Sequence, residues 1–265
     1  MLAPIAADSP KVLAVIQARM ESTRLPAKVF LNLGGRPVLA HVIERMRHSR
    51  LTSDFIVATT VGRGDLPIVG LCAEMGVRVY CGHEQDPLER YYQAARLYGG
   101  EHIVRIKGDC PLLDPEIVDH AIEMHLRTGA DYTGNTLERS YPVGLDVEIL
   151  RRQTLAQVWR DAGLASEREH VTLYIPKHPE LFKIAHLKQA TDLSVKRWTL
   201  DYPQDYAFLQ AVFNELYRRD PVFGMRAVLD FLAAKPELEQ LNAHIPVDAG
   251  VRISLAHDHP AGCPQ

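Results

Sequence analysis

The first 110 residues of this 265-residue chain alternate between short apolar runs and longer amphipathic runs. The apolar runs predict strands at 12–17, 54–59, 77–80 and 103–106, and the amphipathic runs predict helices at 38–48, 66–75 and 88–97. Parallel neighbouring strands need a long crossover, and a helix is the usual one. The alternation therefore predicts an α/β fold with a mostly parallel sheet.

The second half of the chain departs from this alternation. It shows extended pieces at 131–133 and 145–150, a helical run at 152–161 and a loop-rich stretch to about 184, before a strand at 197–200 and helices at 203–217 and 225–233. We expect one domain over 11–235 with an insertion at about 130–184, followed by a C-terminal extension over 236–265. Residues 255–265, rich in Pro and Gly, are expected to fray.

Charge and cysteine content narrow the class of protein. The net charge is −3 and 46% of the residues are hydrophobic, so we expect a globular protein that does not bind nucleic acid. The cysteines lack C-x-x-C spacing, which favours free thiols in a reducing compartment over disulfides or structural zinc. With no secretory signal and no apolar run of membrane-spanning length, the chain is expected to be cytoplasmic and away from membranes.

A basic loop follows the first predicted strand. Arg19, Arg24 and Lys28 alternate there with the hydroxyls of Ser22 and Thr23. Ligands of parallel sheets bind at the carboxyl ends of the strands, and this mixture of donors suits the oxygens of a polyphosphate. The alternative is a solvated basic loop without a ligand.

Two further strand ends carry a carboxylate. Asp109 follows the strand at 103–106, which places it at the same edge of the sheet as the basic loop. Magnesium takes one or two protein carboxylates together with phosphate oxygens, so Asp109 is a candidate ligand, although it could only cap a turn. Asp201 is equally a second ligand or the N-cap of a helix that begins at Pro203.

A third group of charged residues lies in the inserted region. Asp146 and Glu148 share one side of an extended segment, because alternate residues of a strand face the same way. They could bind a hydroxyl-rich acceptor or form ion pairs with Arg151, Arg152 or Arg168.

Six segments, in order along the chain, resemble the cytidylyltransferases that activate acidic sugars. They are Ile16 to Lys28 with Leu33 to Val38, Asp86 to Tyr92, Arg105 to Asp114, Tyr141 to Glu148, Glu167 to Val171 and Arg197 to Tyr206. The resembled branch is the one named for spore-coat polysaccharide biosynthesis, with the CMP-Kdo and CMP-sialic acid synthetases as more distant relatives. The resemblance implies a three-layer, Rossmann-like nucleotidyltransferase fold of the nucleotide-diphospho-sugar transferase type.

The resemblance also implies a reaction and the residues that perform it. CMP would pass from CTP to the hydroxyl of an acidic sugar with release of pyrophosphate, using Mg²⁺. The implied catalytic residues are Arg19, Lys28 and Asp109, and the implied metal ligands are Asp109 and Asp201. The implied nucleotide-binding residues are Ala18, Arg19, Ser22, Thr23, Arg24, Lys28, Thr59, Asp86 and Gly108. The implied acceptor-binding residues are Asp146, Glu148, Arg168 and His170, of which Arg168 and His170 would contact a carboxylate.

Three residues depart from the resembled pattern. Glu21 and Ala27 stand where glycine is common, and Lys107 stands where a small residue is more familiar. Two other functions therefore stay open: cytidylyl transfer to a non-sugar anion such as a phosphonate, and a nucleotide-binding protein of a polysaccharide locus without turnover. We expect CTP and a small anionic acceptor as ligands, and a homodimer through the insertion.

Overall fold

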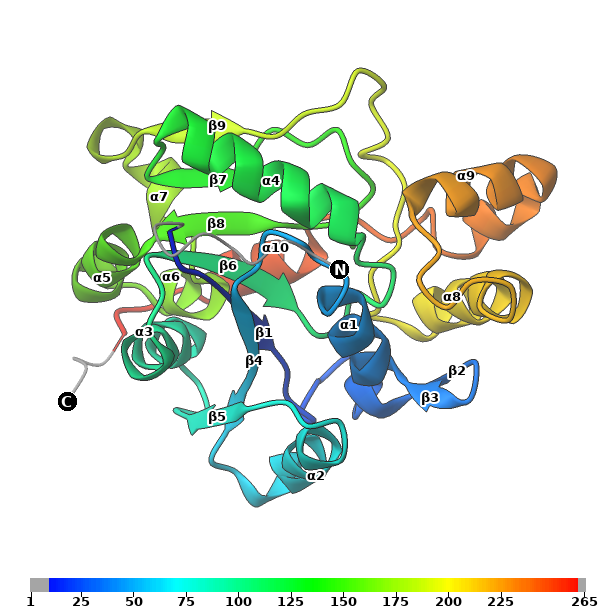
Figure 1. Ribbon diagram of the computed structural model, residues 1–265, viewed down its shortest axis with the longest axis horizontal. Helices are drawn as coiled ribbons and strands as arrows, with labels where there is room; N and C mark the ends of the chain where they lie inside the picture. Colours follow the sequence, from blue (N-terminus) through cyan, green and yellow to red (C-terminus); the bar gives the residue numbers. More distant parts are fainter. Residues whose placement is uncertain (1–9, 262–265) are drawn as a thin grey trace.

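The computed structural model describes residues 10–261, whose strands form one seven-stranded sheet and a separate two-stranded hairpin (Figure 1). The large sheet has the order β5-β4-β1-β6-β8-β7-β9. Its strands are β1 (Val12–Gln17), β4 (Asp54–Thr60), β5 (Val79–Gly82), β6 (His102–Lys107), β7 (Tyr132–Gly134), β8 (Glu148–Arg151) and β9 (Ile184–His186). The hairpin pairs β2 (Asn32–Leu33) with β3 (Arg36–Pro37).

The prediction of a mostly parallel sheet is confirmed. Four of the six pairings in the large sheet are parallel, and only β8 runs antiparallel, to both β6 and β7. Three strands of the region 130–184 therefore complete the central sheet. The carboxyl ends of β1 and β6 lie side by side, because residues Val12 to Gln17 pair in register with His102 to Lys107.

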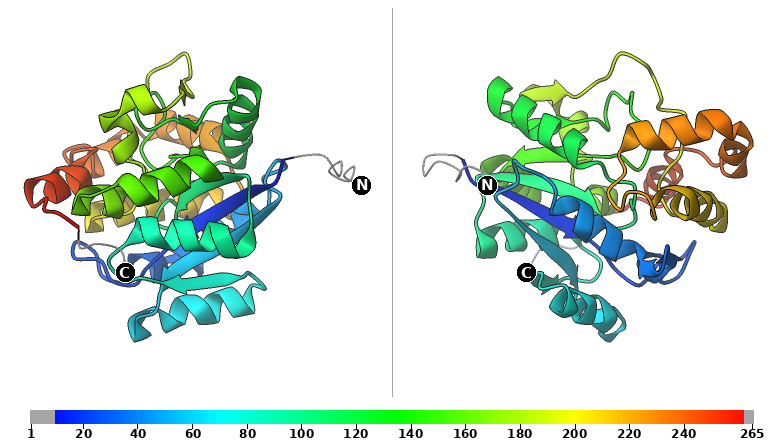
Figure 2. Two further views of the ribbon diagram at one scale, coloured as in Figure 1. Left: turned by 90° about the vertical axis from the view of Figure 1, so that its left-hand side faces the viewer. Right: turned by 45° about the vertical axis from the view of Figure 1, so that its right-hand side comes forward.

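Helices cover both faces of the sheet and make three layers (Figures 1 and 2). They are α1 (Val38–Met46), α2 (Leu66–Glu74), α3 (Pro87–Tyr98), α4 (Pro115–Thr128), α5 (Arg152–Asp161), α6 (Ala165–His170), α7 (Tyr174–Lys177), α8 (Pro203–Leu216), α9 (Met225–Ala234) and α10 (Ala249–Ala256), with short 3-10 turns at Lys28–Phe30, Arg63–Asp65, Pro179–Leu181 and Pro236–Leu241. In β1, Ala14 and Ile16 pack with α1, α4 and α8, whereas Leu13 and Val15 pack with α3 and α5. Alternate residues of this buried strand thus contact the helical layers on opposite faces of the sheet.

Two of the predicted strands are only partly formed. Residues 197–200 form a single bridge, Val143 to Arg197, because the Leu145 amide turns back to the Pro142 carbonyl and the Leu200 amide donates to the Asp109 carbonyl. Strand β8 begins at Glu148 and not at residue 145, because the Asn135 side chain donates to the Leu145 carbonyl and accepts from the Val147 amide. In both places the backbone amides that would extend the ladder have other partners, a side-chain amide oxygen before β8 and backbone carbonyls at 197–200.

The C-terminal segment is more ordered than its composition predicts. Helix α10 packs beside α6 (Figure 2), and residues 257–261, which follow α10, lie against the start of α6 and the residues just before it. Asp258 accepts bonds from the Ser166 amide (3.0 Å) and hydroxyl (2.6 Å), and the Ala261 amide donates to the Gly163 carbonyl (2.8 Å). The expectation of fraying is therefore wrong for 255–261, while 262–265 lie outside the described residues. The domain boundary at 235 stays a prediction.

Candidate active site

A cavity of about 680 Å³ opens at the carboxyl ends of β1 and β6. We call one part of it the loop half, formed by Arg19, Arg24, Lys28, Asp109 and Asp201. The other part, the strand half, is formed by Arg105, Lys107, Arg139, Asp146, Glu148 and His170. Parallel sheets leave such a crevice at this edge, so its place agrees with the sequence expectation.

The basic loop is closed by its own backbone and anchored by Asp65. The Ala27 amide donates to the Met20 carbonyl (2.9 Å), and the Met20 amide donates to Asp65 (2.7 Å). The same carboxylate accepts bonds from the hydroxyls of Thr59 (2.9 Å) and Thr60 (2.6 Å). The sequence analysis missed Asp65, which directly precedes the predicted helix at 66–75. Thr59 is fully buried against it and does not line the cavity.

Ala27, one of the departures from the resembled pattern, has a left-handed backbone, with φ 54° and ψ 25°. A residue with a Cβ pays for this conformation, whereas glycine adopts it freely. The familiar preference for glycine at this position thus has a local backbone cause. Alanine keeps the same turn, which delivers Lys28 to the cavity.

Lys28 joins the two carboxylates that the sequence singled out. Its ammonium group donates to Asp109 and to Asp201, the second bond measuring 2.7 Å. Arg24 also donates to Asp201 (2.8 Å). The Leu200 amide bonds the Asp109 carbonyl (3.0 Å), which brings the two carboxylates to one edge of the cavity.

Asp201 is not the helix cap that the sequence left open. The N-cap residue of α8 is Tyr202, and Asp205 in the first turn of the helix satisfies the amides there, because its carboxylate accepts bonds from the backbone amides of Asp201 (2.9 Å) and Tyr202 (3.0 Å). Asp205 is itself fully buried and paired with Arg197 at 2.8 Å. The Asp201 side chain is left to face Lys28 and Arg24.

The charges of the loop half shift one another's pKa values. Burial disfavours the charged form of Asp201, but Lys28 and Arg24 outweigh it and hold the carboxyl pKa well below its usual range. Burial likewise disfavours charged Lys28, and the attraction of Asp109 and Asp201 reverses this and raises its pKa. Asp201 and Lys28 are therefore both ionised near neutral pH.

The same arrangement fits a divalent cation. The ammonium group of Lys28 lies between two carboxylates, a position that also favours the positive charge of a metal ion. Two carboxylates are enough protein ligands for a Mg²⁺ ion that also binds phosphate. Within residues 10–261, no group of three or more His, Cys, Asp or Glu side chains could hold a metal alone.

Arg19 has no hydrogen bond or ion pair with any residue in the described part of the chain, and it lines the cavity. Ser22 and Thr23 also line it, and so does exposed Glu21, which forms no ion pair within 10–261 and so does not hold Arg24. Ala18 is buried at the cavity's edge. A guanidinium without an internal partner is available to an anionic ligand.

Gly108 has no room for a side chain. A Cβ there would lie 2.9 Å from the Gln17 carbonyl oxygen and 3.0 Å from the Ala18 Cβ. The Gly108 amide donates to the same carbonyl at 2.8 Å. This close approach of β1 and β6 sets the position of Asp109.

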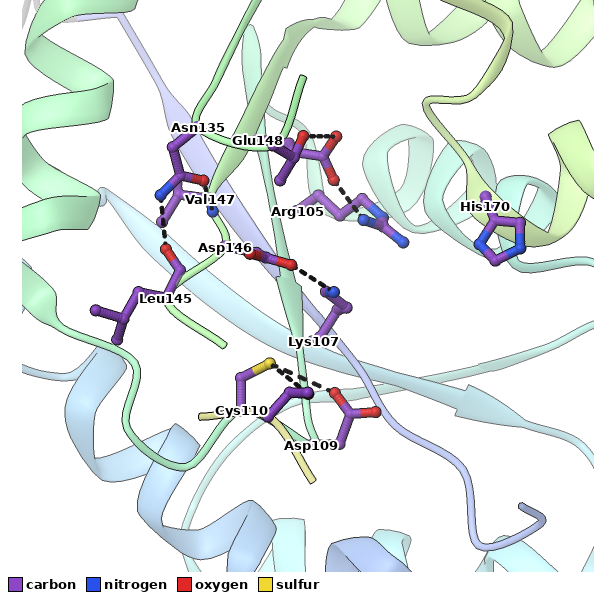
Figure 3. Close-up of polar contacts among 12 residues, drawn as sticks. Arg105, Lys107, Asp109, Cys110, Asn135, Leu145, Asp146, Val147, Glu148 and His170 are labelled. Atoms are coloured by element: carbon purple, nitrogen blue, oxygen red, sulfur yellow. Dashed lines mark hydrogen bonds and ion pairs between the residues drawn. The ribbon is translucent and has the colours of Figure 1, made fainter. Parts of the chain in front are cut away.

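In the strand half, the acids are bound by cations of the chain itself (Figure 3). Asp146 accepts from Lys107 (2.6 Å) and from Arg139 (2.8 Å), and Glu148 accepts from Arg105. The alternative that paired these acids with Arg151, Arg152 or Arg168 is wrong, because their partners are Arg105, Lys107 and Arg139. Antiparallel pairing of β8 with β6 puts Glu148 directly opposite Arg105, which the sequence could not show.

His170 and Arg168 lie on α6 but have different surroundings. His170 lines the cavity, and burial lowers its pKa to about 4, so it is neutral at pH 7. Arg168 lies outside the cavity, where it donates to Asp86 (2.5 Å) and to the Trp159 carbonyl (2.9 Å). Asp86, in turn, caps α3 through the Glu89 amide (2.9 Å). Arg168 and Asp86 therefore join α6 to α3, at a distance from the cavity lining.

A strained residue follows His170. Val171 has φ 60° and ψ −52°, and the Thr172 amide closes this γ-turn on the His170 carbonyl at 2.5 Å. Positive φ is unfavourable for a β-branched residue, and such strain is typical of functional sites. The turn points Thr172 at Glu148, to which its hydroxyl donates at 2.7 Å.

The sequence analysis missed the wall formed by the C-terminal segment. Its cavity-lining residues are Val247, Asp248, Gly250, Val251, Ile253, Ser254, His257 and His259. Ser254 bonds His170 at 2.9 Å and Glu169 at 2.7 Å, so this wall also orients α6. Nothing in residues 247–259 by itself linked them to the basic loop, which lies more than 200 positions earlier in the chain.

The family model described as cytidylyltransferase matches residues 13–245, which end before α10. The spore coat polysaccharide biosynthesis protein SpsF of Bacillus subtilis is 32% identical, over 80% of this chain and 90% of its own length. The 3-deoxy-manno-octulosonate cytidylyltransferase of Chloroherpeton thalassium is 28% identical, over 64% of this chain and 65% of its own. A solved cytidylyltransferase of Leptospira borgpetersenii has a TM-score of 0.83 and 31% identity, covering 87% of this chain and 97% of its own.

Proposed function

Since this chain belongs to the cytidylyltransferase family, we propose that it transfers CMP from CTP to the hydroxyl of an acidic sugar and releases pyrophosphate. The observation that carries this proposal is Lys28 between Asp109 and Asp201, with Arg24 and unpartnered Arg19 beside them. This group offers cations for phosphates and carboxylates for a metal at one edge of the sheet. The similarity to SpsF supports a place in cell-surface polysaccharide biosynthesis.

The loop half would bind the triphosphate. Arg19 and Lys28 would donate to the β- and γ-phosphate oxygens, with Arg24 and the hydroxyls of Ser22 and Thr23 around them. Asp109 and Asp201 would hold Mg²⁺, which neutralises phosphate charge when it is bound. Lys28 exchanges its carboxylate partners for phosphate in this arrangement, and its cationic form is favoured in both states.

The chemistry is a direct displacement at phosphorus. The oxygen of the acceptor hydroxyl forms a bond to the α-phosphorus of CTP while its proton passes to solvent water, the bond from that phosphorus to the bridging oxygen breaks, and pyrophosphate leaves with the electron pair. Positively charged Arg19 and Lys28 stabilise the negative charge that gathers on the leaving group. No protein nucleophile is needed, and burial raises the pKa of the Cys110 thiol beside Asp109, which keeps it protonated.

The strand half would bind the acceptor next to the α-phosphate. Lys107 is the last residue of β6 and Asp109 follows it in the next turn, so the two halves of the cavity adjoin there (Figure 3). Asp146 and Glu148 would act through the cations they hold, because each is almost fully buried. His170, neutral at pH 7, would contact an acceptor hydroxyl.

Pyrophosphate release tests the proposal. The protein is mixed with CTP, Mg²⁺ and, separately, 3-deoxy-manno-octulosonate, sialic acid and an alkylphosphonate. Release with an acidic sugar, lost on omission of Mg²⁺, is the expected result. Release with the phosphonate alone would favour the non-sugar alternative, and CTP binding without release from any acceptor would favour a non-catalytic nucleotide-binding protein.

We also propose a homodimer in the cytoplasm. The extended pieces of the insertion form β7, β8 and the start of β9 within the central sheet, so they do not by themselves require a partner subunit. What supports a dimer is β9, an edge strand whose outer side is open to pairing. Within residues 10–261 no helix is both long and apolar enough to cross a membrane. Light scattering at micromolar protein tests the dimer, which a monomeric mass with full activity would exclude.

A further inference from the structure

Arg105 is a buried arginine on the floor of the strand half. Its side chain is 10% exposed, and it lines the cavity. Only one of its nitrogens, Nη1, has a partner among residues 10–261, and that partner is Glu148. Its buried Nε has no acceptor, and neither has Nη2. These two donors share one edge of the guanidinium plane, and that edge is left for a ligand.

The position of this guanidinium is fixed by Glu148, which is itself held by other side chains. Glu148 accepts bonds from the hydroxyls of Tyr132 (2.7 Å) and Thr172 (2.7 Å) as well as from Arg105. The carboxylate is therefore fully engaged and cannot move over to the free edge. In Figure 3 the guanidinium extends toward the side on which His170 lies.

The charges of the floor do not cancel. Arg105, Lys107 and Arg139 are three cations, and they are paired with two carboxylates, Asp146 and Glu148. One positive charge is thus in excess among these five residues, and the least solvated of the three cations is Arg105, at 10% exposure against 32% for Lys107 and 27% for Arg139. An anion that joins Arg105 relieves the cost of its burial. A ligand with one carboxylate would balance the floor.

We propose that Arg105 binds the carboxylate of the acceptor through its Nε and Nη2 donors, with Lys107 and Arg139 supplying the remaining positive field. This inference rests on the proposed function, because it names the group that recognises the acid of the same acceptor. It replaces Arg168, which is bound to Asp86 outside the cavity. Planar, paired donors at a fixed position are the geometry that carboxylates prefer.

Binding of an acid and its neutral ester tests the role of Arg105 without turnover. Titration calorimetry with CMP present compares 3-deoxy-manno-octulosonate and sialic acid with their methyl esters, in the wild type and in Arg105→Lys. The wild type should bind one acid about 10–150-fold more tightly than its ester, the range of a charged hydrogen-bonded contact. Arg105→Lys keeps the charge but loses the paired edge, so the preference should shrink, while CTP affinity should not change.

Arg151→Lys is the matched control, because Arg151 lies on β8 outside the cavity and donates to the Gly129 (2.7 Å) and Ala130 (3.0 Å) carbonyls. It should keep the full preference for the acid. If Arg105→Lys does not fold, Lys107→Gln serves instead: Lys107 is 32% exposed, and its loss removes the excess charge, so the preference must fall there too.

Three results would overturn the inference: equal binding of acid and ester by the wild type, an undiminished preference in the substituted protein, or no binding of either acid. Failure of the proposed function looks different, because the acid would then bind through Arg105 while CTP releases no pyrophosphate. Conversely, pyrophosphate release with an undiminished preference in Arg105→Lys would refute only the role of Arg105.

Discussion

The two halves of the cavity hold similar numbers of charged side chains but differ in how deeply these are buried and how many partners they have. In the loop half, Lys28 is 12% exposed and Asp201 is 20% exposed, and one ammonium group serves two carboxylates. In the strand half, Asp146 and Glu148 are only 3% and 4% exposed, and each is held by two or more donors. The loop half can exchange partners with a ligand, whereas the strand half is a fixed scaffold. Loss of a charge should therefore impair ligand binding or turnover in the first and folding in the second.

The largest effect is expected from Glu148→Gln in the strand half. Breaking one side of a buried ion pair leaves Arg105 uncompensated and should cost about 3–5 kcal/mol of unfolding free energy. Urea unfolding measures it. Glu138→Gln is the control, because Glu138 is 53% exposed and pairs with Lys188, a surface contact of little value. Equal stability of the two variants would erase the distinction between the halves.

Asp109→Asn should have the next largest effect, on turnover and not on folding. Replacing this carboxylate removes its charge from the metal and phosphate site, with an expected loss of about 10²–10³-fold or more in pyrophosphate release. The unfolding midpoint should stay near that of the wild type, because Asp109 lies in the more exposed loop half. Near-normal release at saturating Mg²⁺ would remove Asp109 from the metal site.

Low pH should reduce the free energy of unfolding through a buried histidine next to β7. His125 bonds the Thr133 hydroxyl of β7 at 2.9 Å, and burial, with help from His102 and Arg151, lowers its pKa to about 4. Since the unfolded chain takes up this proton near pH 6.5, stability is full above that pH and falls as the pH drops toward 4, by about 3 kcal/mol. Urea unfolding at pH 7, 5.5 and 4 should show a smaller pH slope in His125→Gln. Parallel slopes would contradict the assignment.

Lys28→Ala should weaken CTP binding more than it alters stability. The substitution removes a charge-assisted contact to phosphate worth about 1.5–3 kcal/mol, or roughly 10–150-fold in the dissociation constant. Calorimetric titration with CTP and Mg²⁺ measures it. Arg47→Ala, at an exposed pair with Glu44 outside the cavity, is the control. Unchanged CTP affinity in Lys28→Ala would mean that the loop half does not hold the triphosphate.

The smallest effect is expected from Ala27→Gly. Glycine relieves the left-handed backbone but adds freedom to the unfolded chain, so the net gain should be within about 1 kcal/mol. Urea unfolding gives its sign, and CTP affinity should be kept. A loss above this size would show that the Ala27 methyl group packs in the loop half and that its backbone strain is minor.

Much of the loop half could be predicted because it depends on a local rule. Strands in βαβ units end at one edge, so Arg19, Lys28 and Asp109 could be placed together from the positions of two apolar runs. The alternation of apolar and amphipathic segments gave the parallel sheet in the same way. The metal or cap alternatives for Asp201 could not be separated, because they depend on whether Asp205 satisfies the amides at the start of the helix.

The sequence by itself determined the α/β class with a mostly parallel sheet, the edge of the sheet where ligands bind and the basic loop that faces it, since each follows from residues close together in the chain. Tertiary structure alone decided the partners of the buried charges and the far wall of the cavity. Arg105 meets Glu148 because β8 pairs antiparallel with β6, although 43 positions separate them. Residues 247–259 reach the same cavity because Asp258 is bound to Ser166 of α6. Contacts between distant segments depend on strand register and packing, which no local pattern of residues encodes.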